Sequence, residues 1–109
     1  MMRVTFSLVL AALALTACGP DDDDILFDGV FFRTKLKTER KARTNFIVTT
    51  SPASASLLGA RESIRYEATV YCVNRYGRSD IDWVVGPDSP DEELQIVNNT
   101  LTLQGSCVE

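Results

Sequence analysis

The strongest constraint on the fold is a change in the spacing of apolar residues along the chain. On both sides of a polar turn at residues 39–44, apolar and polar residues alternate with a period of two, which is typical of half-buried strands. Between Ser51 and Gly77 the spacing becomes helical, and after Gly77 it returns to that of strands. The sequence therefore predicts an α+β domain: a small antiparallel sheet of four to five strands with one long helix packed on one face, in the order β-β-α-β-β.

The first predicted hairpin joins strands Val30–Glu39 and Asn45–Thr50 through the polar turn. In the first strand, uncharged side chains predicted to face inward alternate with charged ones that face outward. The inward set is Phe32, Thr34, Leu36 and Thr38, and the outward set is Arg33, Lys35, Lys37 and Glu39. In the second strand, Phe46 and Val48 share one face. We therefore expect a hairpin with one face on the core and the other in solvent.

The helical segment has a predicted cap at each end. Ser51 or Ser56 suits the N-terminal cap, and Gly77 suits the left-handed position after the last turn. Residues at helical spacing predict the face that packs on the core, with Cys72 at its border: Leu57, Ala60, Ile64, Ala68 and Tyr71. Gly59 lowers helix propensity, so it indicates either a later helix start or a close approach of another backbone.

Beyond the helix, Ser79–Val85 is predicted to be a strand with Ile81, Trp83 and Val85 facing inward. Two prolines, a glycine and two aspartates predict a loop at residues 86–91. Leu94–Val97 and Thr100–Leu103 are then predicted to pair around Asn98-Asn99, because asparagine tolerates the positive φ of a two-residue turn.

The N-terminal segment has the composition of an export leader. Arg3 precedes an apolar run, Val4–Ala17, of fourteen residues. At about 1.5 Å per residue, a helix of this length spans roughly 21 Å, which is shorter than the roughly 30 Å hydrocarbon core of a bilayer. The run is therefore predicted to be a cleaved signal peptide and not a permanent membrane helix.

The end of this run, Leu15-Thr16-Ala17-Cys18, resembles the lipobox of bacterial lipoproteins. The resemblance implies cleavage after Ala17, a diacylglyceryl thioether on Cys18 and acylation of the new amino terminus with a fatty acid such as palmitate. It also implies attachment to the cell envelope through this lipid anchor, facing the periplasm. Gly19 resembles the pattern for sorting to the outer membrane in preference to the inner one. The alternative is an ordinary signal peptide followed by a cysteine that is not lipidated.

The expected organisation is thus a signal peptide at residues 1–17, an acidic tether at residues 18–24 and a single small periplasmic domain at residues 25–109. With Cys18 assigned to lipid, Cys72 and Cys107 remain as an even pair in an oxidising compartment, so we predict a disulfide. Two free thiols or a metal pair are the alternatives. The chain contains no histidine, so two cysteines would make a poor transition-metal site, and we expect no metal or cofactor.

Several classes of function have little support in the sequence. Without histidine the commonest general base is missing, and no glycine-rich phosphate-binding loop follows a strand. Asp80 and Asp82 form a carboxylate pair on paper, but their alternation with Ile81 and Trp83 favours solvent-facing positions. A net charge of −4 gives no case for nucleic acid. We therefore expect a protein that is not an enzyme, with a small periplasmic hydrolase as the remote alternative.

Two surfaces are predicted to bind other molecules of the cell envelope or a second copy of the chain. Arg33, Lys35 and Lys37 form a basic ladder suited to anionic envelope polymers or head groups, unless they only protect a strand edge from aggregation. Tyr66, Val70 and Val73 form a second apolar stripe opposite the core face of the helix, suited to an envelope protein or a second copy, unless they are scattered surface residues. The expected function is a non-catalytic binding, accessory or structural module, with a self-associating structural lipoprotein as the alternative.

Overall fold

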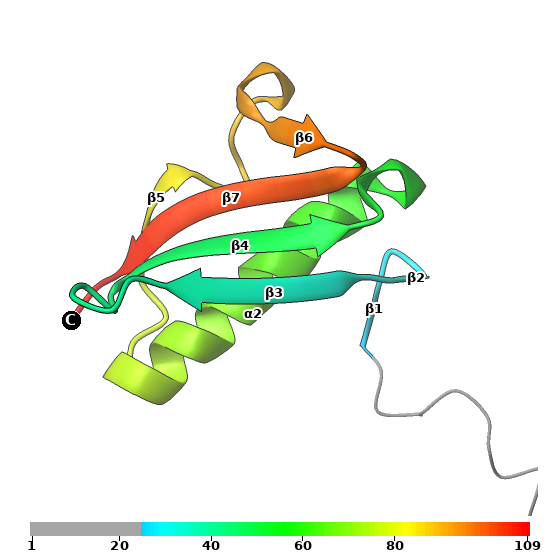
Figure 1. Ribbon diagram of the computed structural model, residues 1–109. Helices are drawn as coiled ribbons and strands as arrows, with labels where there is room; N and C mark the ends of the chain where they lie inside the picture. Colours follow the sequence, from blue (N-terminus) through cyan, green and yellow to red (C-terminus); the bar gives the residue numbers. More distant parts are fainter. Residues whose placement is uncertain (1–24) are drawn as a thin grey trace, which may run out of the picture.

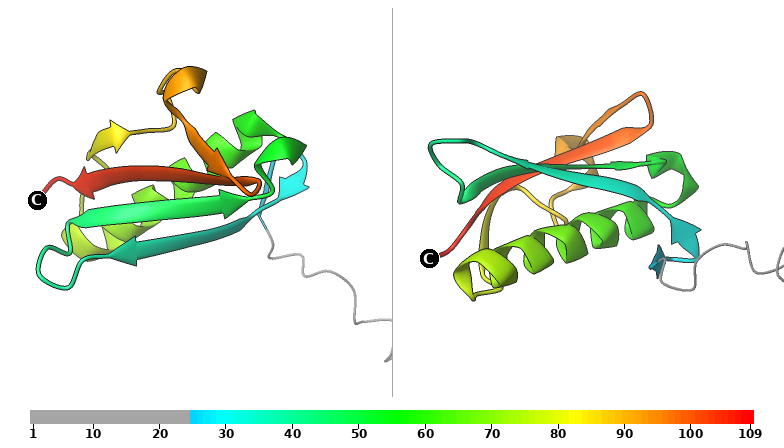
Figure 2. Two further views of the ribbon diagram at one scale, coloured as in Figure 1. Left: turned by 45° about the horizontal axis from the view of Figure 1, so that its top comes forward. Right: turned by 60° about the horizontal axis from the view of Figure 1, so that its bottom comes forward.

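The computed structural model describes residues 25–109, and these form the expected α+β arrangement. One long helix lies along one face of a twisted antiparallel sheet, as the views in Figures 1 and 2 show. The predicted signal peptide, lipobox and acidic tether lie outside the described residues.

The strands and helices follow one another in the predicted order, with short additional elements. The strands are β1 (Leu26–Phe27), β2 (Val30–Phe31), β3 (Arg33–Thr38), β4 (Asn45–Ser51), β5 (Ile81–Val85), β6 (Gln95–Val97) and β7 (Thr100–Cys107). The helices are the short 3₁₀ turns η1 (Ala53–Ala55) and η2 (Asp91–Glu93) and the long helix α2 (Leu57–Tyr76). The main sheet has the order β3-β4-β7-β5, and β6 also pairs with β7, whereas β1 and β2 form a separate two-stranded sheet.

The first predicted strand, Val30–Glu39, is wrong as a single strand, because it is interrupted at Phe32. Val30 and Phe31 pair with β1, whereas the later part of the predicted strand, β3, pairs with β4. Phe32, which is 6 % exposed, packs beside Gly59 at the start of α2. Burial of this ring under the helix therefore separates the two strands. Thr38, predicted to face inward, is exposed at the end of β3.

The β1–β2 ribbon was not predicted, although its turn carries a recognisable signal. Asp28 and Gly29 both have positive φ, 52° and 73°. An Asp-Gly pair with this backbone is typical of a two-residue hairpin turn. The Asn98-Asn99 turn, which was predicted, has the same property, with φ values of 51° and 63°.

Helix α2 is capped by Ser56 at its N-terminus and by Gly77 at its C-terminus. The hydroxyl of Ser56 accepts a hydrogen bond from the Gly59 amide at 2.9 Å and donates one to Asp28 at 2.6 Å. Gly77, with φ of 74°, ends the helix. A Cβ on Gly59 would lie 2.6 Å from the Phe27 carbonyl oxygen. Of the two alternatives for Gly59, the close approach of another backbone is therefore confirmed, and the later helix start is wrong, because α2 begins at Leu57.

The core lies between α2 and the sheet. Four residues of α2 are fully buried: Ala60, Ile64, Ala68 and Cys72. Cys72 therefore belongs to the core itself and not to its border. The predicted core residues Leu57 and Tyr71 are half-buried. They face buried residues of the two central strands: Phe46, Val48, Leu101 and Leu103. The buried Ser63 hydroxyl donates to Thr50 at 3.0 Å and the Thr50 hydroxyl contacts that of Thr34 at 2.9 Å. The buried hydroxyl groups therefore satisfy one another.

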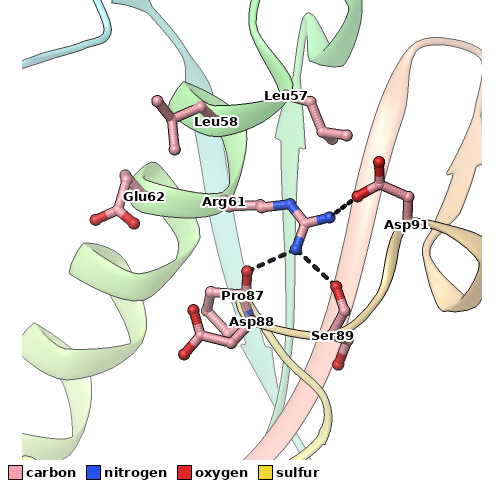
Figure 3. A pocket seen from close by; sticks show the side chains of 8 residues that line it. All are labelled: Leu57, Leu58, Arg61, Glu62, Pro87, Asp88, Ser89 and Asp91. Carbon is pink, nitrogen blue, oxygen red and sulfur yellow. Dashed lines mark hydrogen bonds and ion pairs between the residues drawn. The ribbon is translucent and has the colours of Figure 1, made fainter.

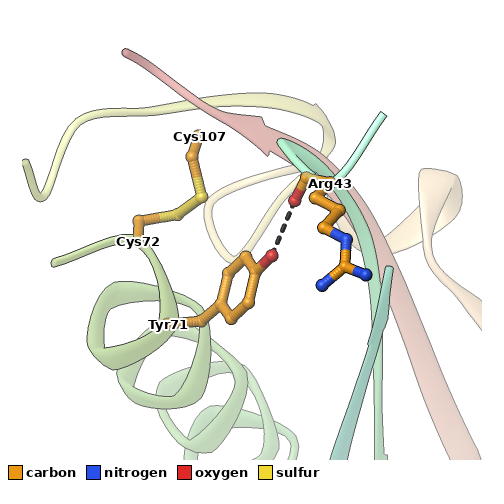
Figure 4. The surroundings of a disulfide bond; sticks show 4 residues. All are labelled: Arg43, Tyr71, Cys72 and Cys107. Atoms are coloured by element: carbon orange, nitrogen blue, oxygen red, sulfur yellow. Dashed lines mark hydrogen bonds between the residues drawn. A yellow bond between two sulfur atoms is a disulfide. The ribbon is translucent and has the colours of Figure 1, made fainter. Parts of the chain in front are cut away.

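The predicted disulfide between Cys72 and Cys107 is confirmed, with 5.5 Å between the two Cα atoms. It joins the last turns of α2 to the end of β7 (Figure 4). Strand β7 is longer than predicted, because it continues to Cys107 through Gly105. A Cβ on Gly105 would lie 2.9 Å from the Asp82 carbonyl oxygen and 3.0 Å from the Trp83 ring, so a larger residue here would force β5 to shift.

Candidate interaction site

The edge of the sheet at β3 is the most distinctive exposed feature. Within the described residues, β3 pairs with β4 on one side and with no strand on the other (Figure 1). An edge strand of this kind presents backbone N–H and C=O groups that can pair with another chain. The predicted basic ladder lies on this strand.

The three cations of the ladder are exposed on the solvent face of the sheet. Across the β3–β4 pair, Arg33 lies opposite Ser51, Lys35 opposite Thr49 and Lys37 opposite Ile47. None of the ion pairs formed within residues 25–109 involves these cations. The ladder is therefore a row of positive charge without an acidic counterpart in the part of the chain that the structure describes.

The other side of β3 borders a groove against α2, which we call the β3–α2 groove. It consists of two depressions that follow one another along the strand. The smaller, about 220 Å³, is lined by Ile25, Phe27, Phe31, Phe32, Thr34, Ser63, Tyr66 and Glu67. The larger, about 520 Å³, is lined by Leu36, Thr38, Glu67, Val70, Tyr71, Asn74 and Arg75. Glu67 lines both, so the depressions adjoin each other.

Two tyrosines of α2, Tyr66 and Tyr71, form part of the walls of the groove. The ring of Tyr66 packs against Phe27 of β1, with 5.8 Å between the ring centroids. The hydroxyl of Tyr71 donates to the carbonyl oxygen of Arg43 at 2.7 Å (Figure 4), and its ring meets Phe46 edge-on at 6.3 Å. Each tyrosine ring therefore contacts a second element besides its own helix.

The structure divides the predicted apolar stripe of the helix. Tyr66, Val70 and Val73 are 45 %, 38 % and 44 % exposed. Tyr66 and Val70 line the groove, whereas Val73 does not. The fold thus brings two residues of the stripe and the whole basic ladder to opposite sides of one strand edge. Sequence periodicity gave no indication of this proximity, because β3 and α2 belong to separate segments.

The opposite flank of α2 is partly covered by residues 86–91, and a depression of about 520 Å³ remains beside Arg61 (Figure 3). It is lined by Leu57, Leu58, Arg61, Glu62, Pro87, Asp88, Ser89 and Asp91. Arg61 donates to the carbonyl oxygens of Pro87 and Ser89 at 2.8 and 2.7 Å and forms an ion pair with Asp91, as Figure 3 shows. These contacts hold the predicted loop at residues 86–91 against the helix. Arg61 was not predicted as a contact residue, because a charged residue at the border of a helical face does not indicate which loop it will bind.

Arg65, one turn further along, also binds this loop. Its guanidinium donates to Asp88 at 2.7 Å and lies 3.4 Å from Glu62. The hydrogen bond from Arg65, together with its positive charge, lowers the pKa of Asp88. The same hydrogen bond raises the pKa of Arg65. Both groups are exposed, so the pair orients the loop more than it stabilises the fold.

The acidic pair considered for catalysis has ordinary surroundings. Asp80 precedes β5 and forms an ion pair with Arg78 at 2.7 Å, and Asp82 is exposed on the strand. Neither residue lines the depressions described above or the one beside Arg61. Among residues 25–109, no group of three or more acidic or cysteine side chains is placed to hold a metal ion.

No family model, curated protein or solved structure matches this chain. In the described range, no helix combines the length and apolar character needed to cross a bilayer. The interaction site therefore has to be interpreted from its own geometry.

Proposed function

We propose that the protein is a lipid-anchored module of the bacterial cell envelope that binds a partner protein without catalysing a reaction. The anchor is Cys18, lipidated after removal of residues 1–17, and the domain faces the periplasm, with the outer membrane as the preferred site. Residues 18–24 form the tether between lipid and domain. The binding surface is the β3 edge with the β3–α2 groove beside it.

The anchoring part rests on the leader and on the cysteines. A short apolar run ending in Leu15-Thr16-Ala17-Cys18 resembles a lipobox. The disulfide between Cys72 and Cys107 fits an oxidising compartment, because disulfides are rare in the cytosol of most bacteria. Together these features support export, and two or three acyl chains would make the attachment stable.

One observation carries the binding part: a strand edge that pairs with no other strand of residues 25–109 lies between a row of cations and a groove whose walls combine Leu36, Val70 and Tyr71 with polar side chains. In the groove, Val70 and Tyr66 remain 38 % and 45 % exposed although Tyr66 also packs against Phe27. An exposed apolar patch beside unpaired backbone groups is typical of a protein-binding surface.

Mass spectrometry of the native protein tests the anchor. We expect a chain that begins at Cys18 and carries fatty acid, and membrane association that is lost in Cys18→Ala. A native chain that retains its leader or lacks fatty acid would overturn this part of the proposal.

Site-specific photocrosslinking in cells tests the binding surface. A photoreactive residue at position 70 should capture a discrete partner, whereas the same residue at position 84, which is 71 % exposed on β5, should not. Equal capture at the two positions, or none at position 70, would count against the groove as the binding surface.

Self-association is the second candidate, because all three residues of the helix stripe are accessible. Sedimentation of the full-length protein in detergent distinguishes it. A dimer that dissociates in Val70→Glu with Val73→Glu would favour the structural role, and a monomer at high concentration would exclude it.

A further inference from the structure

The geometry points to a particular mode of binding: we propose that β3 accepts an extended segment of the partner as an additional strand of the sheet. This inference rests on the proposed function, since it requires a protein partner. The added segment would place acidic side chains beside Arg33, Lys35 and Lys37 and apolar side chains in the β3–α2 groove. The class of ligand is therefore a peptide in which acidic and apolar residues alternate.

The backbone of β3 supplies the first argument. In an antiparallel pair, alternate residues direct their N–H and C=O groups away from the neighbouring strand. Among residues 25–109, β3 has β4 as its neighbour on one side and no strand on the other, so these groups are available over a strand of six residues. An added strand would satisfy them, and a ligand bound only through side chains would not.

The spacing of the depressions supplies the second argument. Thr34 lines the smaller depression, and Leu36 and Thr38 line the larger one. Residues two apart in a strand lie roughly 6.6 Å from each other and point to the same face. Every second side chain of an added strand would therefore enter the groove, first beside Thr34 and then beside Leu36.

The cations of β3 determine which side chains suit the outward-facing positions of the added strand, which alternate with the positions that enter the groove. On the opposite face of β3, the three cations are exposed, and within the described residues none forms an ion pair. Acidic residues directly across from cations stabilise a strand pair, and like charges destabilise it. The outward positions of the added strand should therefore be aspartate or glutamate.

The same charges disfavour a second copy of β3 as the occupant. Antiparallel pairing of two β3 strands about a two-fold axis would set Lys35 opposite Lys35 and Arg33 opposite Lys37. Every outward pair would then be a repulsion between cations. Edge-to-edge dimerisation is thus opposed by the ladder, whereas pairing with an acidic strand is favoured by it.

Binding of synthetic peptides to the full-length protein in detergent tests this mode. The probe is an eight-residue peptide of alternating glutamate and valine, and its counterpart alternates lysine and valine. We expect the acidic peptide to bind and to slow hydrogen exchange of β3 amides, and the basic peptide to bind at least about tenfold more weakly.

N-methylation of the peptide separates strand addition from other contacts. Methyl groups on alternate amides block backbone pairing when those amides face β3, and are tolerated when they face away. Two peptides methylated at the two alternate sets should therefore differ, with one losing binding by at least about tenfold and the other retaining it. Equal binding of both would overturn the inference, as would failure of the unmethylated acidic peptide to bind at millimolar concentration.

Charge reversal on the protein supplies the matched control. Lys35→Glu with Lys37→Glu should weaken the acidic peptide and strengthen the basic one. Arg40→Glu with Lys41→Glu changes the net charge equally but lies in the turn beyond β3, so it should have a much smaller effect. Equal loss in both variants would indicate attraction to net charge alone and would contradict strand addition.

The failure of this inference is distinguishable from failure of the proposed function. If position 70 captures a partner in cells but the two methylated peptides bind alike, the protein is a binding module that does not accept a strand. If position 70 captures nothing, the binding function itself fails. Dimerisation seen by sedimentation, together with slow hydrogen exchange of β3 amides in the absence of peptide, would contradict the peptide as occupant.

Discussion

The two flanks of α2 differ in what covers them. On one flank, residues 86–91 pack against the helix through Arg61 and Arg65, and the disulfide ties α2 to β7. On the other flank, the β3–α2 groove has no covering segment within residues 25–109. We call these the closed flank and the open flank.

The comparison shows how this small domain separates stability from recognition. The closed flank uses partly buried hydrogen bonds from Arg61 and a covalent link, and these hold the helix on the sheet whether or not the other side is filled. The open flank can then keep Val70 and a strand edge accessible without loss of the fold. The following variants test whether this separation holds.

The largest effect is expected for the disulfide of the closed flank. Cys72→Ala with Cys107→Ala should lower the free energy of unfolding by about 3 to 4 kcal/mol, because the link closes a loop with a sequence separation of 35 residues. Denaturant unfolding of the full-length protein measures this loss. The wild-type protein under reducing conditions should show a similar loss, and a loss below about 1 kcal/mol would show that the covalent link is not a main support.

Arg61→Ala should be the next most damaging change. It leaves the carbonyl oxygens of Pro87 and Ser89 without their donor, which we expect to cost about 2 kcal/mol of unfolding free energy. Hydrogen exchange should also become faster in residues 86–91. Arg40→Ala, in the exposed turn, is the control and should be nearly neutral. Equal effects of the two substitutions would contradict the assigned role of Arg61.

Val70→Ala on the open flank should change the free energy of unfolding by less than about 0.5 kcal/mol, because this side chain remains 38 % exposed. The same substitution at Val48, which is fully buried, should cost about 2 kcal/mol or more. Thermal unfolding compares the two. A large loss at Val70 would mean that the open flank supports the fold, and the separation of roles would fail.

The smallest effect concerns the pH dependence of the loop contact. Arg65 lowers the pKa of Asp88 in the folded protein. The contact therefore contributes stability at pH values above the ordinary pKa of aspartate. This stability is lost as the pH falls through the lower pKa of the folded state. Titration of the Asp88 carboxyl by NMR should give a midpoint below the ordinary value. Arg65→Gln should restore that value and Glu62→Gln should not. An unchanged midpoint in Arg65→Gln would contradict the cause.

Much of the fold was predictable because it depends on local patterns. The alternation around Phe46 and Val48 predicted β4, the helical spacing of Ala60, Ile64 and Ala68 predicted α2, and the parity of cysteines predicted the disulfide. The break at Phe32 was not predictable, since it arises from burial of that ring beside Gly59, far along the chain. The β1–β2 turn was predictable in principle, because Asp28-Gly29 is a local turn signal.

The candidate site was predicted only in its parts. The ladder of Arg33, Lys35 and Lys37 and the stripe containing Tyr66 and Val70 were each visible as periodic patterns. Their meeting at one strand edge was not, because it depends on the sheet order, which places β3 at the edge, and on the side of α2 that faces β3. Arg61 could not be predicted because its partners, two backbone carbonyls and Asp91, lie in a loop about 30 residues further along the chain.

The sequence by itself determined the long helix, most strands of the main sheet, the pairing of the cysteines and the periodic rows of charged and apolar surface residues, because each of these follows from neighbours a few positions away or from simple parity. Only the tertiary structure decided which flank of the helix is covered and which is left open. That choice depends on contacts between segments distant in sequence. On one side, loop carbonyl groups accept hydrogen bonds from an arginine, and on the other side β3 has no further strand as a neighbour within residues 25–109.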